Sequence, residues 1–307
     1  MTWRVQIADR IAEVGVERLR ERAEVVQESS LTDIGQMDAL IVRGSTQVGR
    51  QEFERGRPRL KVIGRAGVGV DNIDLDAAAE HQVIVVNAPL AATNAVAEHA
   101  LGLMFALSRH MSRADARMKQ GEWPKKALLG MELSDHSLGV LGMGRIGSAL
   151  AVKATALGMN VLGCDPPLAD EEITRRGAKP TTMSELLGRS EFLSIHVPLT
   201  EDTRGLIGRD EFSRMRPGAR LVCTSRGGVV NEDAMLEALE SGQLAAAGLD
   251  VFESEPPGRT ELVLHPNVIA TPHLGAQTVE AQTRASKDIA DEVLAALAGD
   301  ELRWRVI

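Results

Sequence analysis

The sequence contains no tyrosine, and aromatic residues make up only 3% of its 307 residues. Nothing in the sequence explains this absence. Also missing is any uninterrupted run approaching the roughly 18 to 20 apolar residues that a membrane-spanning helix needs. The N-terminal segment MTWRVQIADR has no apolar core of signal-peptide length. We therefore expect no membrane partner and a cytoplasmic location.

The chain also lacks an excess of positive charge. Lysine and arginine number 35 against 43 aspartates and glutamates, which gives a formal net charge of -8. Such a balance repels nucleic acid and anionic lipid unless a local patch overrides it. We expect no nucleic-acid partner and favour a soluble metabolic role.

Cysteines and clusters of metal ligands are scarce as well. The two cysteines, Cys164 and Cys223, lie in strand-like runs. A buried, reduced thiol is the simpler interpretation there, and a reactive or ligating cysteine is the alternative. The seven histidines show no ligand-like clustering with cysteines or acids. We expect no metal site.

What the chain does have is enough length, and at 44% enough hydrophobic residues, for two cores. Short β-branched runs alternate with helical patterns, which is typical of an α/β fold with parallel sheets. A first series of strands is expected at residues 3–8, 38–44, 60–66 and 83–87. A second is expected at residues 138–142, 160–164, 192–197, 220–225, 245–251 and 267–271.

An apolar helix from residue 94 to 108 and a loop up to Gly130 separate the two series. A long amphipathic helix and a short tail follow the second series. Six strands in that series, with helices between them, predict a doubly wound sheet of dinucleotide-binding type.

The segment LGVLGMGRIG places Gly142, Gly144 and Gly147 in a G-x-G-x-x-G pattern between a predicted strand and a predicted helix. Glycines at this spacing permit a tight turn, a close approach to a pyrophosphate and close packing of the helix on the sheet. The helix N-terminus stabilises the phosphate charge. This context predicts a dinucleotide site.

Asp165 follows the next predicted strand. An acid there can accept hydrogen bonds from the ribose hydroxyls of the cofactor and disfavours a 2'-phosphate, so NAD is expected rather than NADP. The alternative is that Asp165 is only a turn residue before Pro166 and Pro167.

Further segments carry a family likeness, namely GRAGVGVDNID (64–74), NAVAEHAL (94–101), HVPLT (196–200), TSRGGVVNE (224–232), GLDVFESEPP (248–257) and TPHLGA (271–276). Over nearly the whole chain, and in the same order, they resemble the D-isomer-specific 2-hydroxyacid dehydrogenases, especially the phosphoglycerate dehydrogenases. The resemblance implies two doubly wound parallel-sheet domains. A Rossmann-type NAD-binding domain (94–276) would be inserted into a flavodoxin-like substrate-binding domain (1–93 and 277–307).

The resemblance also implies the roles of three catalytic residues. His273 matches the family's general acid/base, Glu255 the acid that pairs with it, and Arg226 the arginine that holds the substrate carboxylate. An imidazole suits proton transfer near neutral pH, and a guanidinium suits a carboxylate. Taken singly, each residue could also be an ordinary surface or capping residue.

The same resemblance assigns the cofactor and substrate contacts. Asp250 would orient the nicotinamide end of NAD, and His196 would line the cofactor crevice. The other cofactor contacts expected are Arg145, Ile146, Val197, Pro198, Thr203, Thr224 and Ser225. The substrate contacts expected are Arg43, Arg65, Val68, Gly69, Asn94 and, from a partner subunit, Lys125.

The basic residues decide which substrate is expected. Arg43, Arg65 and Lys125 would suit a phosphorylated acid, although Lys125 is a point charge where an arginine fork might stand, and all three could be solvated charges. With these residues, the resemblance implies NAD-dependent oxidation of D-3-phosphoglycerate in serine biosynthesis as the expected reaction. The alternatives are a glyoxylate or hydroxypyruvate reductase, another D-2-hydroxyacid dehydrogenase and, more distantly, an NAD-sensing scaffold of corepressor type.

Two further expectations concern assembly and regulation. The apolar helix 94–108 with the following loop predicts a homodimer through the nucleotide domain. After the last helix the sequence leaves no room for a C-terminal regulatory domain, so no serine feedback through such a domain is expected.

Overall fold

The computed structural model describes residues 2–307, and they form two α/β units. One unit contains the residues up to Thr93 together with Ala276–Ile307, and the other is Asn94–Gly275. We call them the split unit and the inserted unit, because both ends of the chain build the first. Ala276, expected at the end of the nucleotide domain, lies in the split unit.

The split unit is built on a parallel five-stranded sheet in the order β2-β1-β3-β4-β5, which is the flavodoxin-like order. Its strands are β1 (Trp3–Ile7), β2 (Ala23–Gln27), β3 (Ala39–Val42), β4 (Val62–Arg65) and β5 (Ile84–Asn87). Its helices are α1 (Glu13–Arg20), the 3-10 turn η1 (Ile34–Gln36), α2 (Arg50–Gly56), α3 (Leu75–Glu80) and α12 (Val279–Ala298).

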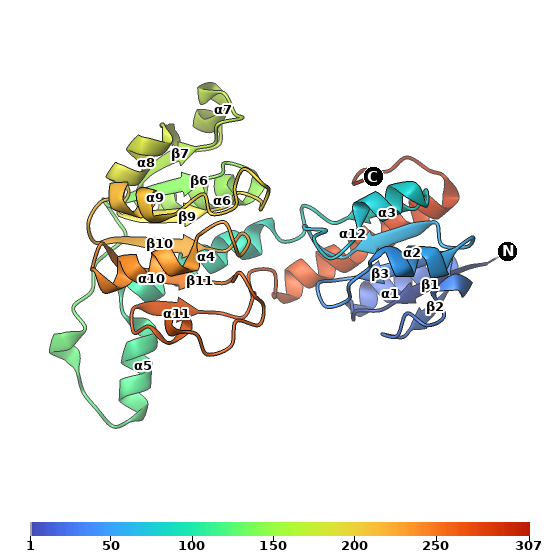
Figure 1. Cartoon of the computed structure of the whole chain (residues 1–307), viewed down its shortest axis with the longest axis horizontal. Coiled ribbons are helices and arrows are strands. Elements are labelled where there is room, and N and C mark those ends of the chain that lie inside the picture. The colour runs from blue at the N-terminus through green and yellow to red at the C-terminus, as the bar shows by residue number, and fades with distance from the viewer. Residues whose placement is uncertain (1) are drawn as a thin grey trace. The chain divides into compact units, whose positions relative to one another are not determined.

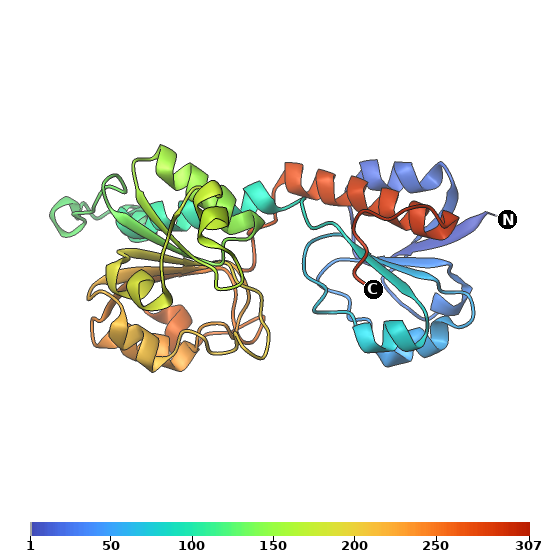
Figure 2. The same ribbon diagram turned by 90° about the horizontal axis from the view of Figure 1, so that it is seen from above.

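Helices cover both faces of this sheet (Figure 2). On one face α1 and α12 contribute Val16, Ile289 and Val293 to a buried cluster with β1 and β4. On the other face α2 and α3 pack through a second cluster, to which Phe53 belongs. The predicted long helix, α12, thus packs on a sheet whose strands come from the N-terminal part of the sequence.

The tail after α12 pairs with the edge strand of the same sheet. Arg305 forms an antiparallel bridge with Val86. The backbone N–H of Val306 donates to the carbonyl of Val85 at 2.8 Å. The tail therefore covers an edge that would otherwise present unpaired backbone groups.

The inserted unit is built on a parallel seven-stranded sheet in the order β12-β11-β10-β9-β6-β7-β8. Its strands are β6 (Ser137–Leu141), β7 (Asn160–Cys164), β8 (Lys179–Pro180), β9 (Phe192–Ile195), β10 (Ala219–Cys223), β11 (Leu244–Leu249) and β12 (Val268–Ala270). Counted from β6, this is the Rossmann order 3-2-1-4-5-6 with one more strand.

Helices cover both faces of this sheet as well. They are α4 (Thr93–Ser108), α5 (Met111–Lys119), the 3-10 turn η2 (Lys125–Ala127), α6 (Arg145–Ala156), α7 (Asp170–Arg175), α8 (Met183–Arg189), α9 (Arg209–Arg214), α10 (Glu232–Glu240) and α11 (Glu261–Leu264). The buried cluster on one face includes residues of α4 and α6, and the cluster on the other includes residues of α8, α9 and α10. The expected fold class is confirmed.

Three elements differ from the sequence expectation. The strands β2 and β8 were not expected. Both are edge strands, and β2 has only one buried residue, so neither shows the apolar run of a central strand. The expected loop up to Gly130 contains the helix α5, none of whose residues is buried. In Figure 1 this segment, 111–130, projects from the inserted unit.

Candidate active site

His273 and Glu255 are hydrogen-bonded to each other in the inserted unit. His273 follows β12 and Glu255 lies in the loop after β11, and His273 Nδ1 is 2.8 Å from Glu255 Oε2. An ionised carboxylate can only accept a hydrogen bond, so Nδ1 carries the proton and a neutral ring keeps its lone pair on Nε2. The side chains are 49% and 38% exposed, so a small molecule can reach them.

The loop around Glu255 keeps its carboxylate ionised. Its second oxygen, Oε1, accepts from the backbone N–H of Phe252 at 3.1 Å. Burial alone would raise the pKa of Glu255, but the hydrogen bonds from His273 and Phe252 and the attraction of the imidazole lower it overall. The pair can therefore hold a proton on His273 in a defined orientation.

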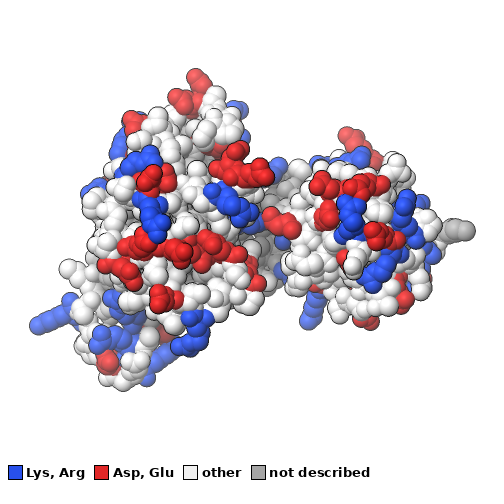
Figure 3. Space-filling model, in the orientation of Figure 1, with Lys and Arg blue, Asp and Glu red and all other residues white. Residues whose placement is uncertain are grey.

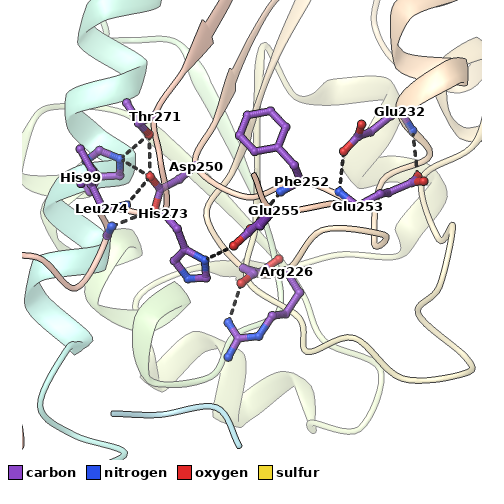
Figure 4. Close-up of polar contacts among 12 residues, drawn as sticks. His99, Arg226, Glu232, Asp250, Phe252, Glu253, Glu255, Thr271, His273 and Leu274 are labelled. Atoms are coloured by element: carbon purple, nitrogen blue, oxygen red, sulfur yellow. Dashed lines mark hydrogen bonds and ion pairs between the residues drawn. The ribbon is translucent and has the colours of Figure 1, made fainter. Parts of the chain in front are cut away.

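Arg226 lies beside this pair (Figure 4). It follows β10, and its Nη1 donates to the carbonyl of Ser225 at 2.6 Å. The next residue, Gly227, allows the contact between loops, because a Cβ there would lie 1.8 Å from the carbonyl oxygen of Phe252. The loop of Arg226 is thus packed backbone to backbone against the loop of Glu255.

Asp250 is buried, at 1% exposed, directly after β11. Its carboxylate accepts from Thr271 Oγ1 at 2.6 Å, Leu274 N at 2.7 Å and Gly275 N at 2.8 Å. His99 Nε2 on α4 lies 3.2 Å from Oδ1. Burial alone would raise the pKa of Asp250, but these partners lower it overall. His99 could not be singled out from the sequence, because nothing near it in the sequence indicates its partner.

The glycine loop connects β6 to α6. Gly142 has a φ of 91°, and a Cβ there would lie 2.8 Å from the backbone of His196, so both the turn and the contact require glycine. No heavy atom lies within 4 Å of a Cβ built on Gly144. Asp165, at the end of β7, accepts from the backbone N–H of Met143 at 2.8 Å. The loop, the helix start and the acid therefore meet at one edge of the sheet.

Two buried polar atoms at this edge have no hydrogen-bond partner, His196 Nδ1 and Thr224 Oγ1. They follow the adjacent strands β9 and β10. Burial lowers the pKa of His196 to about 4, so its ring is neutral at neutral pH, and its Nε2 lies 2.8 Å from Ser194 Oγ. Polar atoms left open beside a glycine loop fit a dinucleotide in the crevice where the strand order reverses.

The other expected cofactor residues lie on the same side of this sheet. Arg145 and Ile146 begin α6, Val197 and Pro198 follow β9, and Ser225 follows β10. Thr203 fastens the loop after β9, because its hydroxyl donates to the carbonyl of Pro198 at 2.6 Å. The carboxyl ends of three strands, β6, β9 and β10, thus supply all of these residues.

Arg43 and Arg65 lie at the carboxyl ends of adjacent strands in the split unit, where Val42 and Arg65 are paired in register. Arg43 Nη2 donates to Gln277 Oε1 at 3.3 Å, and burial lowers its pKa against the attraction of Asp9. The following loop contains Val68 and Gly69, and the carbonyl of Val68 accepts from Asn87 Nδ2 at 2.7 Å.

The last two expected substrate contacts belong to the inserted unit. Asn94 lies in the first turn of α4, and Lys125 is exposed in η2, within the projecting segment 111–130. Lysine and arginine side chains gather around α5 at that end of the unit (Figure 3). Lys125 thus belongs to the projecting segment and not to the loops that carry Arg226, Glu255 and His273.

Two features are absent from residues 2–307. Within this range no three or more histidines, cysteines, aspartates or glutamates form a group that could hold a metal ion. Among the same residues, no helix combines the length and the apolar character needed to cross a membrane.

A family model for the D-isomer specific 2-hydroxyacid dehydrogenase, NAD binding domain, matches residues 101–275. The chain belongs to this dehydrogenase family. Among solved structures, a glyoxylate reductase from Paecilomyes thermophila has a TM-score of 0.90 at 29% identity, covering 99% of this chain and 98% of the other. A D-lactate dehydrogenase from Aquifex aeolicus, complexed with NAD and lactic acid, has a TM-score of 0.84 at 29% identity, covering 97% and 96%.

Among curated relatives, a D-3-phosphoglycerate dehydrogenase from Bacillus subtilis is 43% identical to this chain over 297 residues. The alignment covers 95% of this chain and 56% of the relative. The chain thus spans about half the length of such relatives. The family resemblance and the expectation of an NAD-binding domain are confirmed.

Proposed function

We propose that the protein oxidises D-3-phosphoglycerate at C2, with NAD as the oxidant, and so supplies 3-phosphohydroxypyruvate for serine biosynthesis. The observation that supports this proposal most directly is the hydrogen-bonded pair of His273 and Glu255 next to Arg226 in an NAD-binding domain. The similarity to phosphoglycerate dehydrogenases supports the choice of substrate.

In this proposal His273 is the general base and acid. Its Nε2 takes the proton of the C2 hydroxyl during oxidation and returns it during reduction, while Nδ1 stays bonded to Glu255. The ionised Glu255 stabilises the imidazolium that forms and fixes the ring. Arg226 binds the substrate carboxylate and polarises the C2 oxygen.

The cofactor residues are assigned from the same edge of the sheet. When bound, NAD would accept the hydride that leaves C2. The amides at Gly142, Gly144 and the start of α6 would hold the pyrophosphate, and Asp165 the ribose hydroxyls. His196, Thr224 and their neighbours in sequence would line the crevice.

Arg43 and Arg65 are proposed to bind the phosphate of the substrate. Their place at the ends of two adjacent strands supports a joint role, and two guanidinium groups match a phosphate dianion well. Val68, Gly69 and Asn94 are assigned to the carboxylate end, and Lys125 to the phosphate of a substrate bound to a partner subunit.

A second candidate is reduction of glyoxylate or hydroxypyruvate. The close likeness in fold to a glyoxylate reductase favours it. The same Arg226, Glu255 and His273 would serve both reactions, so the outer anion contacts alone separate them.

The deciding experiment compares three reactions of the purified protein. NADH formation from D-3-phosphoglycerate is measured beside NADH consumption with hydroxypyruvate and with glyoxylate. We expect kcat/KM to be highest with the phosphorylated acid, and Arg65→Met to weaken that reaction selectively. A preference for the unphosphorylated acids, unaltered in Arg65→Met, would replace the proposal by its alternative.

The segment 111–130 supports a homodimer through the inserted unit. Four of its apolar side chains are exposed to solvent: Met111 and Met118 at 49%, Trp123 at 78% and Leu129 at 87%. Exposed apolar groups of this size on one projecting segment are suited to burial against a second copy of the chain.

A further inference from the structure

His99 lies on α4, in the second turn after the chain enters the inserted unit, and its side chain is 22% exposed. Its Nε2 lies 3.1 Å from Thr271 Oγ1 and 3.2 Å from Asp250 Oδ1. The inserted unit begins at Asn94 and ends at Gly275. The imidazole of His99 thus connects the helix at the start of the unit to Asp250, which binds the backbone of Gly275 at its end.

The partners of His99 decide where its proton lies. Thr271 Oγ1 is only 2.6 Å from Asp250 Oδ1, so the threonine hydroxyl donates to the carboxylate and offers only lone pairs to other groups. The carboxylate of Asp250 can only accept. His99 must therefore carry a hydrogen on Nε2 and donate it to Thr271, Asp250 or both.

Asp250 in turn holds the loop 271–275 in place. The backbone N–H groups of Leu274 and Gly275 donate to its two carboxylate oxygens, and the N–H of His273 donates to its backbone carbonyl at 2.9 Å. His273 has a φ of 51°, a left-handed conformation that a non-glycine residue adopts only when its surroundings impose it. The loop is thus wrapped around one buried carboxylate (Figure 4).

We propose that His99 is a positioning residue for the dehydrogenase reaction: by donating from Nε2 to Thr271 and Asp250, it fixes the loop that presents His273 to the substrate. This inference rests on the proposed role of His273 as the base. Without the donor, Asp250 and Thr271 lose one partner in a buried network, and the loop loses a constraint against α4.

His99→Leu removes the donor, whereas His99→Gln can keep an N–H at a similar place. The matched control is His136→Leu, because His136 makes a comparable contact with a carboxylate: its Nδ1 lies 3.0 Å from Glu191 Oε1, next to the start of β6. A second variant, Thr271→Val, removes the hydroxyl that joins His99 to Asp250 and serves if His99→Leu does not fold.

The first measurement is amide hydrogen exchange of the protein without cofactor. We expect the N–H groups of His273, Leu274 and Gly275 to exchange faster in His99→Leu and Thr271→Val than in the parent. His99→Gln and His136→Leu should exchange like the parent at these three sites. Parent-like exchange there in both His99→Leu and Thr271→Val overturns the proposal, whatever the activity.

The second measurement is steady-state kinetics. In His99→Leu, kcat should fall about 10- to 100-fold, because a displaced base loses orientation, while the KM for NAD stays near that of the parent. His99→Gln should restore most of kcat. If kcat is unchanged in His99→Leu, the positioning role is wrong. If the parent itself oxidises no 2-hydroxy acid, the proposed function fails, and the exchange data alone decide whether His99 holds the loop.

Discussion

His273 Nδ1 and Glu255 Oε2 are 2.8 Å apart, although they come from different loops of the inserted unit. The Glu255 carboxylate is fixed by the N–H of Phe252, and the His273 backbone is fixed by Asp250. The two ends of this hydrogen bond are therefore held by separate backbone contacts, so either side chain can be changed without unfolding the loop that carries the other.

Replacing His273 tests its proposed role as the base. His273→Gln should lower kcat by about 10²- to 10⁴-fold, because the positioned proton acceptor is lost, while affinity for NAD changes little. Stopped-flow or steady-state rates combined with NADH fluorescence titration measure both quantities. His265→Gln, in the same unit, is the control and should behave like the parent. Undiminished turnover in His273→Gln would remove His273 from the mechanism.

Replacing Glu255 tests the partner of the histidine. The lowered pKa of Glu255 means that its carboxylate stays charged as the pH falls below the ordinary range of a glutamate. In Glu255→Gln the imidazolium of His273 is no longer stabilised by a neighbouring negative charge, so kcat should fall at least about tenfold. The acid limb of the pH–rate profile for oxidation should also move to lower pH. An acid limb at the same pH as in the parent would contradict the pairing.

Asp165 is expected to select NAD. Asp165→Ala should remove the acceptor proposed for the ribose hydroxyls, worth about 1.5 to 3 kcal/mol for a hydrogen bond to a charged group, and the charge that would repel a 2'-phosphate. Titration should show weaker binding of NAD, with NADP weakened less or not at all. Asp170→Ala, at the start of α7, is the control for general loss of negative charge. Equal loss for both cofactors would refute the ribose assignment.

His196 should make stability depend on pH. Because burial lowers the pKa of His196 from its ordinary value of 6.5 to about 4, only the unfolded chain takes up this proton as the pH falls from about 6.5 towards 4. The free energy of unfolding therefore decreases over that window, by up to about 3 kcal/mol at its acid end. His196→Gln, which can still bond to Ser194, should lose this part of the pH dependence in urea unfolding. Identical pH dependence in both proteins would contradict the argument.

The segment 111–130 gives a prediction about assembly. The double variant Trp123→Ser and Leu129→Ser should be monomeric by light scattering at micromolar concentration, where the parent should be a dimer. Val152→Ser, which changes an exposed apolar residue on α6, should leave the dimer intact. A monomeric parent would refute the proposed dimer.

The fold was largely predictable because its signals are local. The central strands are apolar runs, and the glycines of the loop after β6 directly follow such a run. His273 and Glu255 could be named through the family resemblance, but their hydrogen bond could not be seen in the sequence. The assigned roles of all these residues, the cytoplasmic location and the homodimer stay predictions.

What the sequence did not indicate depends on contacts between distant segments. The role proposed for His99 depends on its contacts with Asp250 and Thr271, which lie in the loops after β11 and β12. The edge strand β2 buries only one residue and is held in the sheet mainly by its backbone pairing with β1, so its sequence has only a weak apolar pattern. Helix α5 has no buried residue, so no core-facing stripe marks it within a polar stretch.

The position of α12 near the end of the sequence affects how the chain folds during its synthesis. Ile289 and Val293 complete the core beneath β1 and β4, yet they are synthesised after the whole inserted unit. During synthesis, the sheet formed by the first 93 residues therefore lacks the cover of α12 on one face. Some 180 later residues are made, and can fold, before α12 is available. Until α12 is synthesised, the inserted unit can already be folded, whereas the sheet of the split unit lacks part of its core. Chaperones and proteases would meet the protein at that stage.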